Sequence, residues 1–252
     1  MTKRIAVAGK GGVGKTTFCA LTIKQLLKHN IKPILAVDAD PNSNLAELLN
    51  IKYDTTIADI RDTIRENKNL PPNMAKGDFV DMRLNEIISE GEGIDFIAMG
   101  RPEGKECYCY INELLRGFLS RITKQYAVTI VDNEAGMEHL SRRTMDNVDA
   151  LFIVTDPTVV SINSAKKVYE TAKSLKLKIE NIYLVLNRAK KNTDATSILK
   201  SIPIELIGTL PYDETIISKS ETGEPLSALP ETDSYLLELE KILNKSELVK
   251  TS

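Results

Sequence analysis

Seven short apolar segments recur along the 252-residue chain, and most of their positions are hydrophobic without a polar alternation. Strands that are covered on both faces have this pattern, whereas a half-exposed antiparallel strand alternates apolar and polar residues. The segments therefore predict the strands of a mainly parallel sheet. They are Ile5–Ala8, Pro33–Val37, Ile94–Met99, Ala127–Val131, Ala150–Thr155, Ile182–Asn187 and Glu205–Leu210.

Segments of helical periodicity lie between and after these strands. The expected helices are Lys15–His29, Asn44–Leu49, Thr56–Asn67, Met82–Glu90, Tyr110–Lys124, Ser161–Lys176 and Tyr235–Asn244. Their alternation with strands predicts a single α/β domain over residues 1–252, in which a doubly wound, mainly parallel sheet is flanked by helices and binds ligands at the carboxyl ends of its strands. The Pro- and Gly-containing segment Asn69–Gly77 is expected to be a surface excursion within that domain.

Composition and charge narrow the possible partners only slightly. The chain has 33 Lys and Arg residues against 35 Asp and Glu residues, a formal net charge of −2. This balance gives no general attraction for nucleic acid or for an anionic membrane, so neither is expected as a partner. No apolar run approaches the roughly 20 residues that span a bilayer, and no signal-peptide pattern leads the chain. A cytoplasmic location is therefore expected.

A phosphate-binding motif follows the first predicted strand and begins the first predicted helix. Residues 9–16 read Gly-Lys-Gly-Gly-Val-Gly-Lys-Thr, which fits G-x-x-x-x-G-K-[ST]. In such a loop backbone N–H groups converge on phosphate oxygens, and the helix N-terminus adds positive potential. Lys15 is expected to reach the β- and γ-phosphates, Thr16 to join the Mg²⁺ shell and Thr17 to contact a further phosphate. The remaining loop positions expected at the nucleotide are Gly11, Gly12, Val13 and Gly14.

A second lysine, Lys10, lies inside this loop. With it, the sequence resembles the deviant Walker A ATPases, the family that includes MinD, ParA and the nitrogenase iron protein, and the resemblance covers nearly the whole chain. In that family the extra lysine reaches the phosphates of the partner subunit in a nucleotide-sandwich dimer. The resemblance therefore implies a homodimer and a catalytic role for Lys10, although the residue by itself could equally be a solvated loop charge.

Acidic residues follow two of the predicted strands, at the edge where the nucleotide is expected. Asp38 and Asp40 come after the second strand, where one carboxylate can hold the Mg²⁺ water shell and the other can orient the attacking water. The stretch resembles the first switch of the family, which implies water activation by Asp40 and places Asp38 near the metal. Asp132 ends the apolar strand Ala127–Val131 in a Walker B pattern, and is expected to accept a hydrogen bond from a metal-bound water or from Thr16.

Two further stretches complete the predicted nucleotide site. Glu134 and Gly136 belong to a segment that resembles the second switch, with Gly136 available for a backbone N–H to the γ-phosphate. Asn187 ends an apolar strand, where its amide can bind an adenine edge or simply cap the strand. No Asn-Lys-x-Asp motif is present, so ATP is expected rather than GTP. The loop of Pro211, Tyr212 and Asp213 resembles the one that packs on the base.

The three cysteines divide into one lone residue and one close pair. Cys19 falls within the pattern of the first helix and is expected to be buried. Cys107 and Cys109 lie in an expected loop, where two thiols indicate metal binding, redox chemistry or an unligated structural pair. Two ligands do not complete a metal site, and neither His29 nor His139 has ligand spacing with them. A two-fold dimer supplies four thiolates, which suit Zn²⁺, Cu(I), iron–sulfur clusters or Ni²⁺.

Two longer stretches, Met99–Tyr110 and Asp132–Arg143, resemble the CooC-type maturation factors within the same family. Those ATPases assist nickel insertion into carbon monoxide dehydrogenase, and close relatives serve acetyl-CoA synthase. The resemblance implies a Cys-x-Cys site at the dimer interface that takes Ni²⁺ or Zn²⁺, and a nickel enzyme as client.

Two other functions stay open. A MinD- or ParA-type spatial organiser needs a basic face for a membrane or for DNA, and the helix predicted at Tyr235–Asn244 has none, so this helix is expected to pack on the domain. An ATP-driven electron carrier would hold an iron–sulfur cluster. In the nitrogenase iron protein the two cluster cysteines lie in separate loops, whereas the segment Asp132–Thr144 contains no cysteine here.

Overall fold

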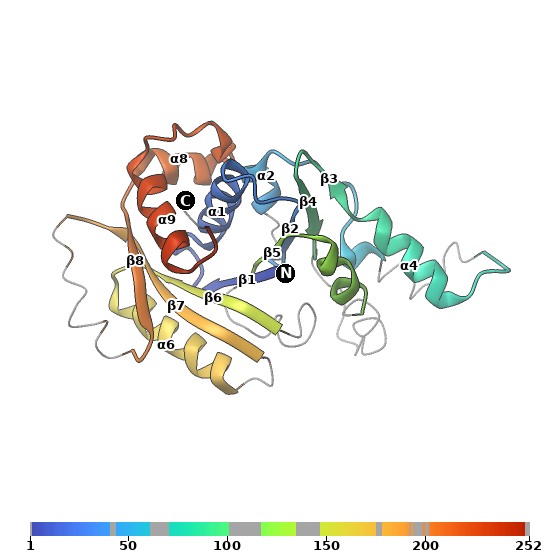
Figure 1. Ribbon diagram of the computed structural model, residues 1–252, viewed down its shortest axis with the longest axis horizontal. Helices are drawn as coiled ribbons and strands as arrows, with labels where there is room; N and C mark the ends of the chain where they lie inside the picture. Colours follow the sequence, from blue (N-terminus) through green and yellow to red (C-terminus); the bar gives the residue numbers. More distant parts are fainter. Residues whose placement is uncertain are drawn as a thin grey trace.

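Eight strands are present in the described part of the computed structural model (Figure 1). They are β1 (Lys3–Gly9), β2 (Ile34–Asp38), β3 (Ser89–Glu90), β4 (Ile94–Ala98), β5 (Val128–Asp132), β6 (Asn147–Thr155), β7 (Lys178–Ala189) and β8 (Glu205–Pro211). They form one sheet in the order β3-β4-β2-β5-β1-β6-β7-β8, in which every pair of neighbours is parallel except β3 and β4. The structure describes residues 2–40, 44–60, 71–100, 117–134, 147–174, 178–191, 193, 199 and 202–249.

Helices cover both faces of this sheet. They are α1 (Lys15–Lys28), α2 (Leu45–Leu49), α4 (Lys76–Glu86), α6 (Val159–Ser174), α8 (Glu214–Thr222) and α9 (Ser234–Lys245), with 3-10 turns η1 (Thr123–Gln125) and η3 (Leu226–Ala228). Residues 57–60 and 117–122 are also helical. One core lies between the sheet and α1, α2 and α9, and the other lies against α4 and α6. Figure 1 shows α6 on the opposite side of the sheet from α1, α8 and α9. The predicted doubly wound α/β fold is confirmed.

The near-continuous hydrophobicity of the strands is explained by these two cores. In β1, Ile5 and Val7 pack into the core beneath α1 and α9, while Ala6 and Ala8 pack into the core on the α6 side. Successive side chains of a strand point to opposite faces, so a strand covered on both faces needs apolar residues at every position. All four side chains are fully buried.

The order of the strands reverses around β1, and this places the phosphate loop. β1 pairs with β5 on one side and with β6 on the other. At the carboxyl edge Gly9 lies opposite Val154, and Asp38 of β2 lies opposite Asp132 of β5. In doubly wound sheets the crevice at such a reversal is where ligands bind. The loop and both carboxylates therefore lie at the expected edge.

The predicted helix Met82–Glu90 is wrong in position. Helix α4 begins six residues earlier, at Lys76, and ends at Glu86, while Ser89 and Glu90 form β3, antiparallel to β4. The Gly91 N–H donates to the Ile94 carbonyl at 2.8 Å, which closes a tight turn between these two strands. The turn brings the chain back along β4. Ser89 and Glu90 therefore pair with β4 as a strand, although their local sequence pattern favours a helix. Helix α4 also begins inside the segment Asn69–Gly77, which was expected to be a surface excursion.

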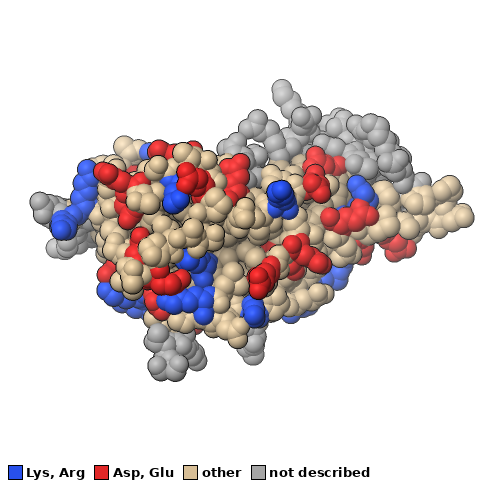
Figure 2. Space-filling model, turned by 90° about the horizontal axis from the view of Figure 1, so that it is seen from above, with Lys and Arg blue, Asp and Glu red and all other residues tan. Residues whose placement is uncertain are grey.

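The last long helix, α9, packs on the domain as expected. Its buried side chains are Tyr235, Leu236, Leu239, Ile242 and Leu243. None of the helices in the described ranges has the length and apolarity needed to cross a bilayer. On the face seen in Figure 2, Lys and Arg side chains are interspersed with Asp and Glu side chains, in keeping with the net charge of −2.

Candidate nucleotide-binding site

The phosphate loop is fitted tightly between the ends of three strands. Gly9 has φ +151°, and a Cβ there would lie 2.2 Å from the Val154 carbonyl oxygen of β6. Gly14 has φ +93°, and a Cβ there would lie 2.4 Å from Nδ2 of Asn187 in β7. Only glycine fits both positions, because a side chain would push the loop away from the sheet. Helix α1 begins directly after this loop, at Lys15.

The two lysines of the loop lie in different surroundings. Lys15 is 7% exposed, and its Nζ donates to the Lys10 carbonyl at 3.2 Å. The ammonium group thus lies over the loop, where phosphate oxygens can replace the carbonyl as acceptors. The Lys10 residue is exposed. The predicted roles of Lys15 at the phosphates of its own site and of Lys10 at those of a partner copy stay predictions.

Two buried carboxylates, Asp38 and Asp132, face the loop from neighbouring strands. Asp38 is fully buried, and its two oxygens accept from the backbone N–H groups of Asp40 at 3.0 Å and Leu45 at 2.9 Å. Burial and then the Asp132 carboxylate raise the pKa of Asp38, which is about 7 although the two hydrogen bonds lower it. Burial likewise raises the pKa of Asp132 to about 6, while the Thr16 hydroxyl and the Lys15 ammonium lower it.

The surroundings of Asp132 fit a bound Mg²⁺ with its water shell. Both of its carboxylate oxygens are buried, and no regular hydrogen bond among the described residues reaches them, although the Thr16 hydroxyl lies close enough to lower the pKa. A buried ionised carboxylate without a partner is costly, and a hard cation with oxygen ligands offsets that cost. Thr16 and Asp132 would hold the ion, directly or through its waters. The ion would neutralise negative charge on the phosphates during phosphoryl transfer.

The remaining switch residues are described only in part. Asp40 and Glu134 are half-buried at the same edge of the sheet. Their predicted catalytic and nucleotide-sensing roles stay predictions. Gly136 lies outside the described residues, as do Cys107 and Cys109. Among the residues that are described, no group of three or more His, Cys, Asp or Glu side chains could hold a metal ion. Cys19 is fully buried, as expected, and burial raises the pKa of its thiol.

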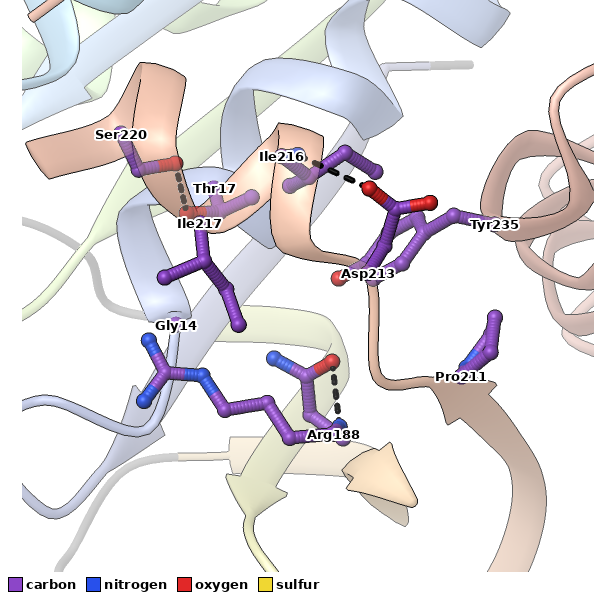
Figure 3. Close-up of a pocket in the computed structure, with 10 residues that line it drawn as sticks. Gly14, Thr17, Arg188, Pro211, Asp213, Ile216, Ile217, Ser220 and Tyr235 are labelled. Carbon is purple, nitrogen blue, oxygen red and sulfur yellow. Dashed lines mark hydrogen bonds between the residues drawn. The ribbon is translucent and has the colours of Figure 1, made fainter. Parts of the chain in front are cut away.

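A pocket beside the loop corresponds to the predicted base site (Figure 3). Asn187 lines it with 2% of its surface exposed. Its Nδ2 donates to the Val13 carbonyl at 2.8 Å, and its Oδ1 accepts from the Arg188 N–H at 2.9 Å. The amide therefore ties the phosphate loop to β7. Recognition of adenine by Asn187 stays a prediction.

Some residues of the loop after β8 line the pocket, and others lie on the surface. Pro211 and Asp213 line the pocket. The Asp213 carboxylate also accepts from the Ile216 N–H at 2.9 Å and so caps α8. Tyr212 is 42% exposed, and Nζ of Lys190 lies 5.3 Å from the centre of its ring. The expected packing of Tyr212 on the base stays a prediction.

Helix α8 and the end of β7 bring residues to this pocket that the motifs did not indicate. Ser220 of α8 lies with its Oγ 3.0 Å from Oγ1 of Thr17. Arg188 and Tyr235 also line the pocket. The sequence does contain a signal for α8 at each end of the helix. Asp is a preferred N-cap residue, as at Asp213, and Gly is preferred just past the end of a helix, as at Gly223. No local motif indicates Arg188.

Comparisons with known proteins agree with this geometry. The family model "CobQ/CobB/MinD/ParA nucleotide binding domain" matches residues 5–226. An uncharacterized ATP-binding protein of Methanocaldococcus jannaschii is 40% identical, over 96% of this chain and 97% of that protein. The carbon monoxide dehydrogenase accessory protein CooC of Rhodospirillum rubrum is 29% identical, over 87% of this chain and 88% of that protein.

Among solved structures, one that superposes on this chain is the septum site-determining protein MinD of Pyrococcus horikoshii, complexed with Mg-ADP. The TM-score is 0.71 and the identity 19%, over 99% of this chain and 97% of that chain. This likeness supports the fold. The family model covers most of the chain, including the phosphate loop and the carboxylates described above. The chain therefore belongs to the CobQ/CobB/MinD/ParA nucleotide-binding family and is a P-loop ATPase.

Proposed function

We propose that this ATPase acts as a homodimer that holds Ni²⁺ through Cys107 and Cys109 of both copies and assists its insertion into carbon monoxide dehydrogenase. ATP controls the distance between the two copies, and with it the metal site. Four thiolates from a two-fold dimer give a complete ligand set for Ni²⁺ or Zn²⁺. A maturation factor for acetyl-CoA synthase is the alternative with the same chemistry.

The observation that carries the proposal is where the cysteine-bearing segment leaves the sheet. Strand β4 ends at Ala98, which lies opposite Asp38, and the Met99 N–H donates to the Asp38 carbonyl at 2.8 Å. Cys107 and Cys109 follow within the next eleven residues of the sequence. The segment that carries the cysteines therefore begins, at Met99, beside Asp38 of the predicted first switch. Only a few residues of the chain connect the predicted first switch to the proposed metal ligands, so a movement caused by ATP hydrolysis can be passed to them along the backbone.

The relatives add support of a different kind. The Rhodospirillum rubrum protein at 29% identity carries the name of a carbon monoxide dehydrogenase accessory protein, and its match extends over 87% of this chain. A substrate metal handed to such an enzyme must be bound reversibly. Thiolates at an interface that opens and closes meet that requirement, because separation of the copies halves the ligand set.

The hydrolytic step uses residues of the described site. Lys15 holds the β- and γ-phosphates, and Lys10 of the partner copy reaches the same phosphates. Asp40 orients a water and accepts its proton as the water oxygen attacks the γ-phosphorus, and the bond to the bridging oxygen breaks to leave ADP and phosphate. Loss of the γ-phosphate removes the contacts that hold the first and second switches, and the dimer opens.

The test is Ni²⁺ binding by equilibrium dialysis under reducing conditions. Cys107→Ser and Cys109→Ser are expected to abolish stoichiometric binding while leaving ADP affinity within about twofold, since the nucleotide contacts lie on other segments. Cys19→Ala is the matched control, because this buried thiol takes no part in the proposed site. Undiminished Ni²⁺ binding by the two Ser variants would contradict the proposal.

The client is tested separately. Apo carbon monoxide dehydrogenase and apo acetyl-CoA synthase are each incubated with Ni²⁺, ATP and this protein, and the activity gained is compared with that gained without ATP. ATP-dependent activation of the first enzyme is expected. Activation of the second enzyme alone would assign the alternative client, and activation of neither would contradict a role in nickel insertion.

A further inference from the structure

The ladder between β7 and β8 is interrupted next to the base pocket. Leu186 lies opposite Thr209 and Ala189 lies opposite Pro211, with a register shift between the two pairs. Inside this shift Arg188 has φ +56°, a left-handed conformation that a residue other than glycine adopts at a cost. A bulge of this kind re-aims side chains, and bulges are frequent next to active sites.

The consequence of the bulge is that two consecutive side chains face the same pocket. In a regular strand the side chains of Asn187 and Arg188 would point to opposite faces of the sheet. Here both line the pocket beside the phosphate loop. The Arg188 N–H donates to Oδ1 of Asn187 at 2.9 Å, so the conformation of one residue is fixed by the side chain of the other.

The chemistry of the pocket suits a flat aromatic ligand next to this arginine. Figure 3 shows the Arg188 side chain extending toward Gly14 of the phosphate loop, with Ile217 of α8 pointing toward it across the pocket. Arg188 carries the only cationic side chain among the described residues that line this pocket. A guanidinium plane stacks on aromatic faces, and an aliphatic side chain can cover the opposite face.

We propose that Arg188 contacts the nucleotide, with its guanidinium group stacked on one face of the ATP base and Ile217 covering the other. The left-handed backbone conformation of Arg188 would then serve nucleotide binding, because it directs the side chain into the pocket. A contact with the face of the base strengthens the binding of ATP and ADP alike, because both carry the same base. It favours purine over pyrimidine nucleotides through the larger stacked area.

The main test is Arg188→Gly, with affinities for Mg-ADP and Mg-ATP measured by calorimetry. Glycine relieves the left-handed strain and removes the side chain. The melting temperature of the protein without nucleotide is therefore expected to be unchanged or higher, while both affinities fall by about tenfold. Glu247→Gly is the matched control, because Glu247 has φ +58° and is exposed at the end of α9, away from the pocket. This control is expected to keep full nucleotide affinity.

Two further measurements separate base stacking from other roles. Competition by inorganic tripolyphosphate, which has no base, is expected to be the same for the wild type and Arg188→Gly. Arg188→Lys keeps the charge without the planar group and is expected to show most of the loss in ADP affinity. A weakened tripolyphosphate interaction, or full ADP affinity in Arg188→Lys, would overturn stacking in favour of a phosphate contact. A lowered melting temperature with unchanged ADP affinity would show that Arg188 serves only the fold.

Discussion

The two buried aspartates of the site differ in what they require from a ligand. Asp38 receives two backbone N–H groups and is satisfied within the protein. Asp132 is equally buried, and no regular hydrogen bond reaches its oxygens in the described part of the chain, although the Thr16 hydroxyl and the Lys15 ammonium lie close enough to lower its pKa. The difference between its ordinary pKa of 3.8 and about 6 corresponds to about 3 kcal/mol at neutral pH. A Mg²⁺ ion held at Asp132 would offset this cost.

Replacing Asp132 by Asn is expected to raise stability and abolish hydrolysis. Without Mg²⁺ and nucleotide, the neutral amide removes a buried charge, so the free energy of unfolding rises by about 1–3 kcal/mol. The folded-state pKa lies above the unfolded value, so ionisation destabilises the fold as pH rises. The gain should therefore be near zero below about pH 4 and complete above about pH 6. Urea unfolding at several pH values with a chelator present measures it.

Asp38→Asn is the comparison for that experiment. Its amide replaces one of two acceptors with a donor, which then faces the N–H of Asp40 or Leu45. Removal of the buried charge opposes the loss of this hydrogen bond, because burial raises the pKa of Asp38 to about 7. Asp38→Asn is therefore expected to gain less stability than Asp132→Asn at neutral pH. An equal gain in both variants would show that burial of charge alone explains the result, and would count against a metal site at Asp132.

Lys15→Ala tests the assignment of the phosphate loop. The ammonium group lies above the loop with the Lys10 carbonyl as its acceptor, and it also lowers the pKa of Asp132. ATP affinity is expected to fall by about 10- to 100-fold through the loss of charge-assisted hydrogen bonds. Calorimetric titration with Mg-ATP measures the change, and an unchanged affinity would place the phosphates elsewhere.

At the scale of elements, helix α8 makes the largest difference between the sequence prediction and the structure. Its nine residues include four β-branched residues and two serines, which have only modest helix propensity. The helix is stabilised by its ends, through the Asp213 side chain that accepts from Ile216 and the left-handed Gly223. Its buried contact Ile216 belongs to the core that also contains α1 and α9.

The contact between α8 and α1 leads to a prediction about Ser220. If the Thr17 hydroxyl donates to a phosphate, it can only accept from Ser220, so Ser220 fixes its direction. Ser220→Ala is expected to weaken ATP and ADP binding by about three- to tenfold without changing kcat, and Thr17→Val should make the Ser220 change silent.

Ser218→Ala is the matched control for this experiment, because Ser218 lies on the same helix and is exposed. Binding measured by fluorescence with a labelled ADP separates the variants. Equal losses in Ser218→Ala and Ser220→Ala, or additive losses in the Thr17 double variant, would speak against a positioning role for Ser220.

The parts of the fold and site that were predictable are those carried by neighbouring residues. The phosphate loop, Asp38 and Asp132 each follow an apolar strand, and the end of a parallel strand defines one edge of the sheet. Arg188 and Ser220 could not be predicted, because their positions depend on a bulge and on the docking of α8. The boundary between α4 and β3 was missed for a similar reason, since strand pairing across a turn overrides the local pattern.

At the scale of the whole molecule, the site lies along one edge of the sheet, and Lys10 at this edge is exposed. In the proposed mechanism the dimer closes before the chemical step. Asp40→Ala is therefore expected to keep ATP binding, slow hydrolysis at least about 100-fold and accumulate the ATP-bound dimer. Size-exclusion chromatography with light scattering in the presence of Mg-ATP measures this. Hydrolysis at the wild-type rate would remove Asp40 from the role of activating water.

The central claim is that nucleotide-controlled association of two copies completes one metal site. Native mass spectrometry of Asp40→Ala, with Ni²⁺ and with ATP or ADP, measures association and metal content in the same species. With ATP, we expect a dimer that carries one Ni²⁺ per two chains, and Cys107→Ser in the same background should give a dimer without metal. A monomer that binds Ni²⁺ stoichiometrically, or an ATP-bound dimer with the same Ni²⁺ content after the Cys107 change, would contradict it.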